Sequence, residues 1–321
     1  MLSTFFVIIN KVNSMNRTKI LVCIVLLLIF SIFFYIFCVK FDEIVIIIGN
    51  VIDSFTDKEV LVPDYVVHNK IYKFDTVDQT EEFVPHNVDD IKKIYYTVLN
   101  NGWDSFTFYC PDSYKTCIDD VKNVANESNF ISIINNYVAP YNSYKKYNTL
   151  IIGDDEVSLT IEKLYTSVEI ATLKLMIEHL IDDLGIDRNN VTRNDLKKIH
   201  DFLINLITYD EDYVEGDENT ISNKANGALL NKIALCSGYT DTYALFMDEL
   251  NIKNFKVSTE NHVWNVVYFD NQWLHIDVTW DDDDKNNKAN DYFFLVNTDE
   301  LLKKDTTDHS FDKTLYLELN Q

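Results

Sequence analysis

The chain has 321 residues, a formal net charge of -23 and hydrophobic residues at 47% of its positions. So large a hydrophobic fraction excludes a disordered chain and provides enough apolar surface for a sizeable core. The negative charge argues against a nucleic-acid partner, because phosphates would be repelled and the sequence offers no basic patch to offset this.

The first long apolar segment, residues 20–39, reads "ILVCIVLLLIFSIFFYIFCV" and contains no charged residue and no helix breaker. About 20 apolar residues, each rising 1.5 Å, span a hydrocarbon core of roughly 30 Å. Lys11, Arg17 and Lys19 precede the segment, and acidic residues follow it. The positive-inside rule therefore predicts a cytoplasmic tail over 1–19, a single uncleaved transmembrane anchor over 20–39 and the rest of the chain outside the cytoplasm. A cleaved secretory signal is the alternative, although no small-residue cleavage site is evident.

Two cysteines after the predicted anchor, Cys110 and Cys117, have a spacing that suits a small-loop disulfide. The residue usage, rich in Asn, Lys and Ile and poor in Arg, is typical of an AT-rich bacterial genome, and the outside of a bacterial cell is an oxidising environment. The same spacing fits two free thiols equally well, so both states stay open. Cys236 has no obvious disulfide partner, and a thiol at that position needs another reason.

Residues 40–165 are predicted to form a juxtamembrane and accessory α+β region. Alternation of apolar and polar residues predicts its strands, and apolar residues at helical spacing predict its helices. The predicted elements are one or two strands within 41–86, a helix over 86–102 that ends at Gly102, a strand over 104–110, a helix over 116–128 and a strand over 156–166.

Two amphipathic helices are expected next, at the start of a domain over residues 166–321. The first, "SVEIATLKLMIEHLIDDLGI", opens on Ser167 as its N-cap. The second opens on Thr192, and Asp195 follows three residues later in the pattern of a capping box. His200, inside the second helix, is interpreted as an ordinary surface or core-edge residue.

A β-hairpin carries the first chemical signal. Its strands, "HVWNVVYF" and "QWLHIDVTW", are rich in β-branched and aromatic residues, and Asp270-Asn271 between them suits a two-residue turn. This turn places Trp264 opposite Asp277 and puts His262 on the same face, diagonal to Asp277. An aspartate in that position fixes the tautomer of the histidine and stabilises its imidazolium form.

The segment "ALCSGYTDTYALFMDELNI" has apolar residues at helical spacing after its cysteine, Cys236. A helix N-terminus carries about half a positive charge, which favours thiolate over thiol. A neighbouring imidazolium strengthens this effect and gives a Cys–His pair that attacks acyl carbonyls. Ser237 and Gly238 are small, so an acyl oxygen can approach the N–H groups of the first turn and be held there as an oxyanion.

Three segments together, "LCSGYTDTYALFMDELNI", "HVWNVVYFDNQWLHIDVTWDD" and "DYFFLVNTDEL", resemble the transglutaminase-like domain family, cysteine acyl-transfer proteins with a papain-like fold. In that family a cysteine opens a helix, a histidine opens a strand in an H-x-W-N context, and an aspartate follows in D-x-T-W. These positions match Cys236, His262 and Asp277, in the same order. The resemblance covers residues 190–310 and implies an α+β fold with helices packed on an antiparallel sheet. Asn226 stands where the family commonly has an aromatic residue, which leaves the substrate cleft undefined.

The resemblance and the motifs predict a membrane-anchored, extracytoplasmic enzyme of thiol acyl transfer, with a protein or peptide substrate such as a cell-envelope component. Cys236 is the expected nucleophile, His262 the proton shuttle and Asp277 the residue that orients His262. The residues expected beside the substrate are Ser237, Trp264 and Trp280. The sequence does not choose between an amine and water as the acyl acceptor. A cysteine peptidase of the same fold and a catalytically inactive surface-binding module are the alternatives.

No cofactor and no metal are expected. Zinc binds cysteine, histidine and aspartate, but no fourth ligand has a suitable spacing. The "DDDD" run at 281–284 offers oxygen ligands of the kind that calcium prefers, yet a solvated loop is the expected structure. His275 shares a face with the predicted site but lies further from the strand end, so it is interpreted as structural.

Overall fold

The computed structural model describes residues 58–213, 221–283 and 288–320, together with residues 19, 21–32, 34, 35 and 40. The chain divides into two compact units, Met1–Glu59 and Val60–Gln321. Among all the residues described, no helix is both long enough and apolar enough to cross a membrane. Most of the predicted tail over 1–19 and several residues of the predicted anchor over 20–39 lie outside the described residues.

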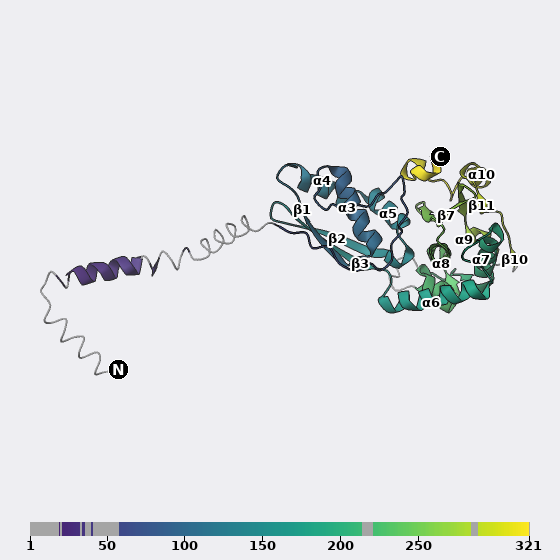
Figure 1. The fold of residues 1–321 in the computed structure, drawn as a ribbon, viewed down its shortest axis with the longest axis horizontal. Coiled ribbons are helices and arrows are strands. Elements are labelled where there is room, and N and C mark those ends of the chain that lie inside the picture. The colour runs from purple at the N-terminus through teal and green to yellow at the C-terminus, as the bar shows by residue number, and fades with distance from the viewer. Residues whose placement is uncertain are drawn as a thin grey trace, which may run out of the picture. The chain divides into compact units, whose positions relative to one another are not determined.

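A three-stranded antiparallel sheet with the order β1-β3-β2 lies in the first half of the second unit, and helices cover one of its faces (Figure 1). In β3 the buried side chains are Val157, Leu159 and Ile161, which alternate with more exposed ones. They share one core with apolar side chains of α3 and α4. The elements of this half are α3 (Val88–Asn101), β1 (Ser105–Tyr109), α4 (Cys117–Asn126), α5 (Ser128–Tyr137), η1 (Pro140–Asn142), β2 (Tyr144–Ile152) and β3 (Glu156–Lys163).

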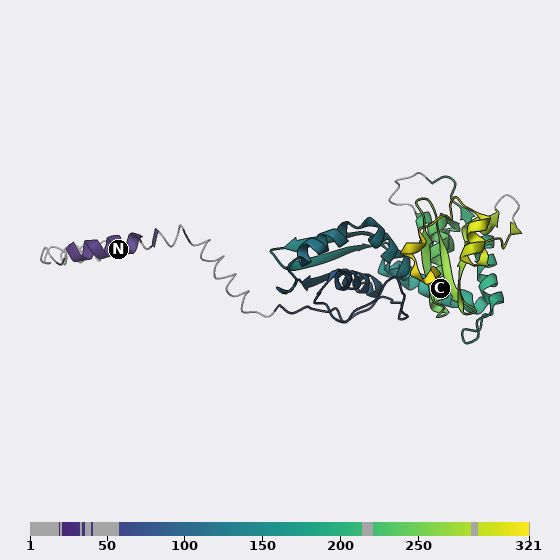
Figure 2. The same cartoon turned by 90° about the horizontal axis from the view of Figure 1, so that it is seen from above.

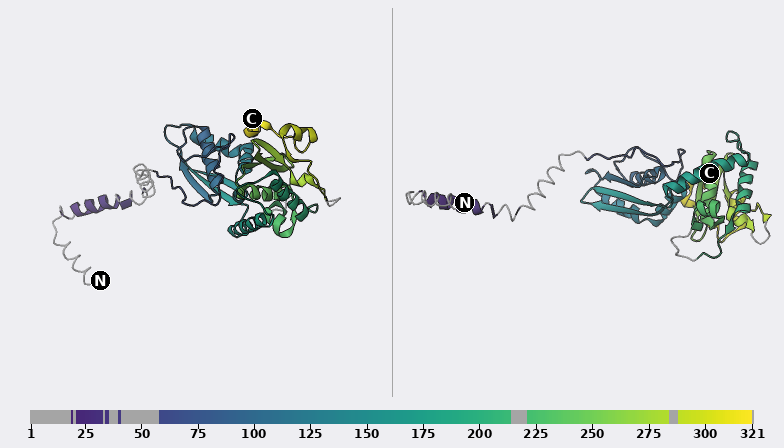
Figure 3. Two further views of the ribbon diagram at one scale, coloured as in Figure 1. Left: turned by 45° about the vertical axis from the view of Figure 1, so that its right-hand side comes forward. Right: turned by 90° about the horizontal axis from the view of Figure 1, so that it is seen from below.

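A four-stranded antiparallel sheet, with the order β11-β8-β7-β6, forms the centre of the second half (Figure 2). Helix α8 packs against this sheet, and α6 and α7 pack against α8; all three are drawn in teal and green in the further views (Figure 3). The elements of this half are α6 (Ser167–Asp183), α7 (Arg193–Leu206), β4 (Thr208–Tyr209), η2 (Ile221–Asn223), η3 (Gly227–Asn231), β5 (Ile233–Ala234), α8 (Cys236–Glu249), β6 (Asn254–Ser258), β7 (Val263–Phe269), β8 (Gln272–Ile276), α9 (Val278–Asp281), β9 (Asp282–Asp283), β10 (Lys288–Ala289), β11 (Phe294–Val296), α10 (Thr298–Lys304), η4 (Lys313–Leu315) and η5 (Leu317–Asn320).

The two faces of the four-stranded sheet belong to different cores. Val267 of β7 packs in a core with α6, α7 and α8, whereas Trp264 and Val266 pack on the opposite face. This opposite face shares its core with α3, α5 and the three-stranded sheet. For example, the ring of Phe255 in β6 lies 4.8 Å from that of Tyr137 in α5. The second unit is therefore held together by one core that runs between its two sheets. The domain boundary predicted between residues 165 and 166 stays a prediction.

Most elements of the accessory region agree with the sequence. The α+β class is confirmed, and so are the strands β1 and β3 and the helices α3 and α4. Helix α3 ends at Gly102, whose φ of 70° is the left-handed conformation of a C-cap and whose N–H donates to the carbonyl of Leu99. Cys110 and Cys117 form a disulfide with a Cα–Cα distance of 5.8 Å, which decides between the two states that the spacing left open.

Two predictions about this part of the chain are wrong. Helix α6 is capped by Thr166 and not by Ser167, because Thr166 forms a capping box with Glu169. The predicted strands within 41–86 are absent from its described residues, 58–86, which are irregular. Backbone groups there bond to α3 and to its side chains instead of to a strand; the N–H of Lys70, for example, donates to the side-chain oxygen of Asn100. Residues 41–57 lie outside the described residues.

Candidate active site

Cys236 is the first residue of helix α8, and one residue separates it from the short strand β5. The residue before it, Leu235, is extended, and its N–H donates to the carbonyl of Ser222. The first helical turn approaches the same carbonyl so closely that a Cβ added at Gly238 would lie 2.5 Å from it. Glycine therefore allows the turn to pack against residue 222. The half-buried sulfur consequently lies at the helix end where backbone N–H groups favour a negative charge.

The hairpin β7–β8 has the register that its sequence predicts. Val266 pairs with His275 and Phe269 pairs with Gln272, so the turn contains two residues. Asp270 and Asn271 have φ angles of 49° and 67°, the left-handed pair that a type I′ turn requires. This register brings the residue before β7 and the residue after β8 to the same end of the hairpin.

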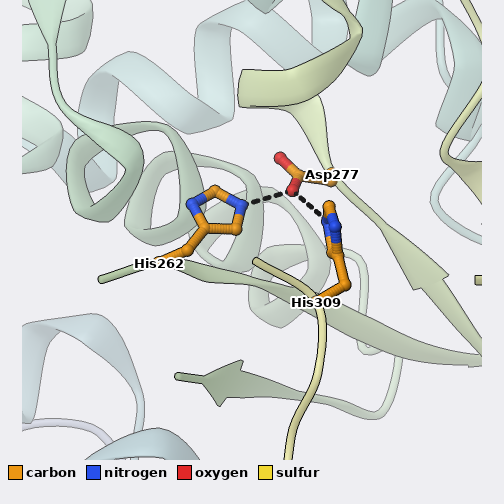
Figure 4. A group of neighbouring side chains, drawn as sticks. All are labelled: His262, Asp277 and His309. Carbon is orange, nitrogen blue, oxygen red and sulfur yellow. Dashed lines mark hydrogen bonds and ion pairs between the residues drawn. The ribbon is translucent and has the colours of Figure 1, made fainter. Parts of the chain in front are cut away.

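His262 and Asp277 occupy those two positions and form a hydrogen bond. The Nε2 atom of His262 lies 2.5 Å from Oδ2 of Asp277, and both side chains are buried (Figure 4). Burial by itself would lower the pKa of His262, but the charge and hydrogen bond of Asp277 outweigh it and raise this pKa to about 10. Burial would likewise raise the pKa of Asp277, yet the charge and hydrogen bond of His262 hold it well below its usual range. The pair is accordingly an imidazolium and a carboxylate at neutral pH.

Cys236 also contributes to the raised pKa of His262, through a side-chain hydrogen bond and through its charge. Because Nε2 of His262 is bonded to Asp277, the nitrogen that remains for the sulfur is Nδ1. In Figure 4 this second nitrogen lies on the side of the ring away from Asp277. His262 and Asp277 thus form the contact that the hairpin register predicts, and Cys236 interacts with His262 strongly enough to affect its pKa.

The three residues expected beside the substrate lie close by but differ in exposure. Trp264 is fully buried, and its ring stacks on His262 at a centroid distance of 5.6 Å. Trp280 is 40% exposed, and its ring centroid lies 6.0 Å from that of His262. Ser237 donates its hydroxyl to the side-chain oxygen of Asn223 at 3.3 Å. Trp280 therefore reaches the surface beside His262, whereas Trp264 supports the histidine from within.

His309 is part of the same cluster, and the sequence patterns do not reveal it. Its Nε2 lies 2.8 Å from Oδ2 of Asp277, the oxygen that His262 also contacts (Figure 4). His309 lies in the loop after α10 and is fully buried. It falls outside the three quoted motifs and on no strand or helix, so no periodicity relates it to the hairpin. The only signal in the sequence is that a histidine is rare in this chain, which has seven.

A metal ion could in principle be held by His262, Asp277 and His309, whose ligand atoms all lie within 4.8 Å of one another. The two rings, however, contact Asp277 at 2.5 and 2.8 Å, which are hydrogen-bond distances. Protons on the two nitrogens account for this geometry without a metal ion. The cluster is therefore interpreted as a hydrogen-bonded chain.

Two other polar residues of this region have structural roles. His275 accepts a hydrogen bond from the indole N–H of Trp264 at 2.9 Å, and burial lowers its pKa to about 3, so it is neutral. Its interpretation as a structural residue agrees with these contacts. The expectation of a solvated loop over 281–284 is wrong for Asp281, which is fully buried, bonds to His200 at 3.1 Å and accepts the N–H of Phe293. A buried carboxylate needs such hydrogen-bond donors. The run of four aspartates in the sequence does not indicate that one of them is buried and has these partners.

Comparison with known proteins gives a limited result. No family model matches the chain, and no curated protein matches it. A crystal structure of a transglutaminase is 18% identical, with a TM-score of 0.32 over 43% of this chain and 44% of that chain. A Cytophaga hutchinsonii protein designated a cysteine protease is 11% identical, with a TM-score of 0.27 over 48% of this chain and 64% of that chain. This chain therefore spans less than two thirds of either structure, and likenesses of this size identify neither its fold nor its activity.

Proposed function

We propose that this protein is a thiol acyl-transfer enzyme with a transglutaminase-like, papain-like domain, in which Cys236, His262 and Asp277 act together. One observation carries the proposal: a buried carboxylate holds Nε2 of His262 at 2.5 Å, and the cysteine at the start of helix α8 interacts with the same imidazole and helps to raise its pKa. This arrangement stabilises a thiolate–imidazolium pair, which is the form of cysteine that attacks acyl carbonyls.

The first half of the proposed reaction forms a thioester. The thiolate of Cys236 attacks the carbonyl carbon of a carboxamide or peptide bond, and the carbonyl oxygen becomes an oxyanion. The first N–H groups of α8, which a helix cannot bond internally, are the proposed donors to that oxygen. His262 then donates its Nδ1 proton to the leaving nitrogen, the carbon–nitrogen bond breaks, and ammonia or an amine departs.

The second half transfers the acyl group. An amine or a water molecule attacks the thioester carbonyl, neutral His262 takes the proton that the nucleophile loses, and the thiolate of Cys236 leaves. The enzyme is restored, and the product is either a new amide or a carboxylic acid. Asp277 keeps His262 in one orientation during both proton transfers. Transfer to an amine gives a transglutaminase, and transfer to water gives a peptidase or a deamidase.

The proposed substrate is a protein or peptide outside the cytoplasm. The apolar run at residues 20–39, preceded by basic residues, supports a membrane anchor with the catalytic region outside. The Cys110–Cys117 disulfide supports an oxidising location, because such bonds persist mainly there. The strongly acidic chain favours a substrate or acceptor that bears amines over one that bears phosphates.

The proposal is tested with the full chain by measuring incorporation of a dansyl amine into casein beside cleavage of the same casein. Amine incorporation without cleavage identifies a transglutaminase, and cleavage identifies a peptidase. The Cys236→Ala variant is the control, and Cys23→Ala is the matched substitution, because it removes another free cysteine and leaves the Cys236 thiol in place. Activity that survives in Cys236→Ala contradicts the proposal, as does a Cys236 thiol that reacts with iodoacetamide at pH 6 no faster than free cysteine.

A further inference from the structure

We propose that His309 is a positioning residue that fixes Asp277, and through it His262, for the thiol chemistry of Cys236. The inference deepens the proposed function and rests on it. It assigns a role to a chain of four side chains, Asp305, His309, Asp277 and His262, which ends at the sulfur.

Both ring nitrogens of His309 bond to carboxylates. Nε2 lies 2.8 Å from Oδ2 of Asp277, and Nδ1 lies 2.8 Å from Oδ2 of Asp305. Asp305 is itself held by the backbone N–H groups of His309 and Thr307, at 2.9 and 3.1 Å, and by the hydroxyl of Thr307 at 2.7 Å. The ring of His309 therefore cannot turn without breaking a bond at each end.

The hydrogen bonds also specify the charge of the chain. An ionised carboxylate accepts hydrogen bonds and donates none, so a ring that serves two carboxylates carries a proton on each nitrogen. His309 is then an imidazolium between Asp305 and Asp277. With the thiolate of Cys236 and the imidazolium of His262, the charges alternate along the whole chain. Each charge is flanked by its opposite, which is the condition under which buried charges are stable.

The surroundings of His309 are aromatic and exclude water. Its ring stacks on Phe293 at a centroid distance of 4.7 Å and makes edge contacts with Trp264 and Trp280 at 4.8 and 5.1 Å. A purely structural ring at this position needs no charge, and apolar residues replace buried ion pairs elsewhere with little or no loss of stability. The positive charge of His309 is therefore explained by its hydrogen bond to Oδ2 of Asp277, the oxygen that His262 also contacts.

The loop that carries His309 is tied to the segment before β7, which carries His262. The hydroxyl of Thr259 donates to the carbonyl of Asp308 at 3.1 Å, and the N–H of Thr259 donates to the carbonyl of His262 at 2.9 Å. A single residue thus connects the two backbones. This connection joins the two backbones close to Asp277, which lies between the two rings.

The test compares His309→Phe with His309→Gln in the full chain. Phenylalanine retains the aromatic packing and removes both donors, whereas the glutamine amide retains a donor near the position of Nε2. The readout is the rate of iodoacetamide alkylation of Cys236 against pH, assigned by peptide mass spectrometry, with kcat and KM for the best acyl substrate. Among the described residues, Tyr209 interacts electrostatically with Cys236, and His275 interacts with His309 and also with Lys313, so these groups are considered beside the members of the chain. Thermal unfolding checks that each variant folds.

His309→Phe is expected to slow alkylation of Cys236 at pH 6 by about tenfold, because one hydrogen bond to a charged group is lost. It is also expected to lower kcat and to leave KM unchanged. His309→Gln is expected to stay within about threefold of the wild type. Asp305→Asn keeps the packing and weakens the hydrogen bond that holds His309. Its alkylation rate and its kcat are expected to lie between those of the two His309 variants. It provides the test if His309→Phe does not fold.

The outcomes separate the two proposals. If wild-type Cys236 reacts rapidly at pH 6 and His309→Phe has the same pH profile and kcat, the role of His309 is refuted and the proposed function stands. An equal loss in His309→Gln and His309→Phe also refutes a role through the donor. If wild-type Cys236 reacts like a free thiol, the proposed function fails and the inference falls with it.

Discussion

Asp277 accepts hydrogen bonds from His262, from His309 and from the backbone N–H of Trp280, although its side chain is almost completely buried. A buried carboxylate is stable only when several donors surround it. Three donors around one carboxylate leave little freedom of rotation, so the imidazole of His262 is held in one orientation. Among single residues, Asp277 is therefore the one at which replacing one atom should disturb the hydrogen bonds of the site most.

The Asp277→Asn substitution removes this charge while keeping the shape of the side chain. The asparagine must present either its oxygen or its NH2 group to His262, and the raised pKa of His262 is lost with the carboxylate. We expect kcat for acyl transfer to fall by about 10³- to 10⁴-fold, as when the aspartate of a comparable triad is replaced by asparagine. Steady-state kinetics measure it, with circular dichroism as the folding control. A kcat within tenfold of the wild type contradicts the proposed role.

The same pair makes a pH-dependent contribution to stability. The pKa of His262 is about 10 in the folded protein against 6.5 as its ordinary value, so its contribution is complete below about pH 6.5 and is lost as the pH rises towards 10. The pKa of Asp277 is lowered from 3.8, so its contribution is present above that value and is lost as the pH falls. The contribution is therefore largest between about pH 4.5 and 6.5.

Thermal unfolding of the wild type and Asp277→Asn at several pH values tests this window. We expect the difference in unfolding free energy to be roughly 1.5–3 kcal/mol near pH 5.5, the size of a hydrogen bond to a charged group. It should shrink steadily between pH 7 and pH 10. A difference that is constant from pH 5 to pH 10 would mean that the two side chains are not coupled as an ion pair.

Among the elements, the hairpin β7–β8 and helix α8 could be read from the sequence because local chemistry specifies them. Asp270-Asn271 requires a two-residue turn, and that turn alone determines which residues of the two strands meet. The contact of His262 with Asp277 follows from it. The position of His309 could not be read, because its loop reaches Asp277 by tertiary contacts that no local pattern encodes. The irregular segment 58–86 was misread for the same reason, since α3 and its side chains satisfy its backbone.

The start of helix α8 depends on Gly238. A Cβ at this position would lie 2.5 Å from the carbonyl oxygen of Ser222 and 2.9 Å from the Cβ of Ala234. Gly238→Ala should therefore push the first turn away from residue 222, move Cys236, and lower the unfolding free energy by about 1–3 kcal/mol as an overpacking substitution does. Chemical denaturation and the rate of Cys236 alkylation measure the two effects.

Gly153→Ala is the matched control for that substitution. Gly153 has a φ of 62° and no atom within 4 Å of an added Cβ, so alanine there adds backbone strain without a clash. We expect its cost to be about 1 kcal/mol, with no effect on alkylation of Cys236. Equal alkylation rates in Gly238→Ala and Gly153→Ala would show that the contact with residue 222 does not position the sulfur.

At the scale of the whole molecule, the second unit is joined by contacts between segments far apart in the sequence. Glu318, near the C-terminus, accepts a hydrogen bond from the hydroxyl of Thr76 at 2.8 Å and another from that of Tyr137 at 2.5 Å. Phe255 of the four-stranded sheet contacts Phe74, Tyr137 and Tyr316 through its ring. Patterns along the chain predict elements but not which elements share a core, so the packing of Phe255 against Phe74 and Tyr137 could not be read from the sequence.

This shared core predicts how truncation affects folding. A fragment of residues 166–321 loses every partner of Phe255 from before residue 166 and exposes the sheet face that includes Trp264, at about 1.5–3 kcal/mol for each large side chain. We expect the fragment to unfold without a cooperative transition and to bind a hydrophobic dye. A chain that starts at residue 58 retains the whole second unit and should unfold at the same temperature as the full chain. Calorimetry of the three chains measures their unfolding transitions. A fragment 166–321 that unfolds cooperatively at the temperature of the longer chains would show that the region before residue 166 is not part of the same core.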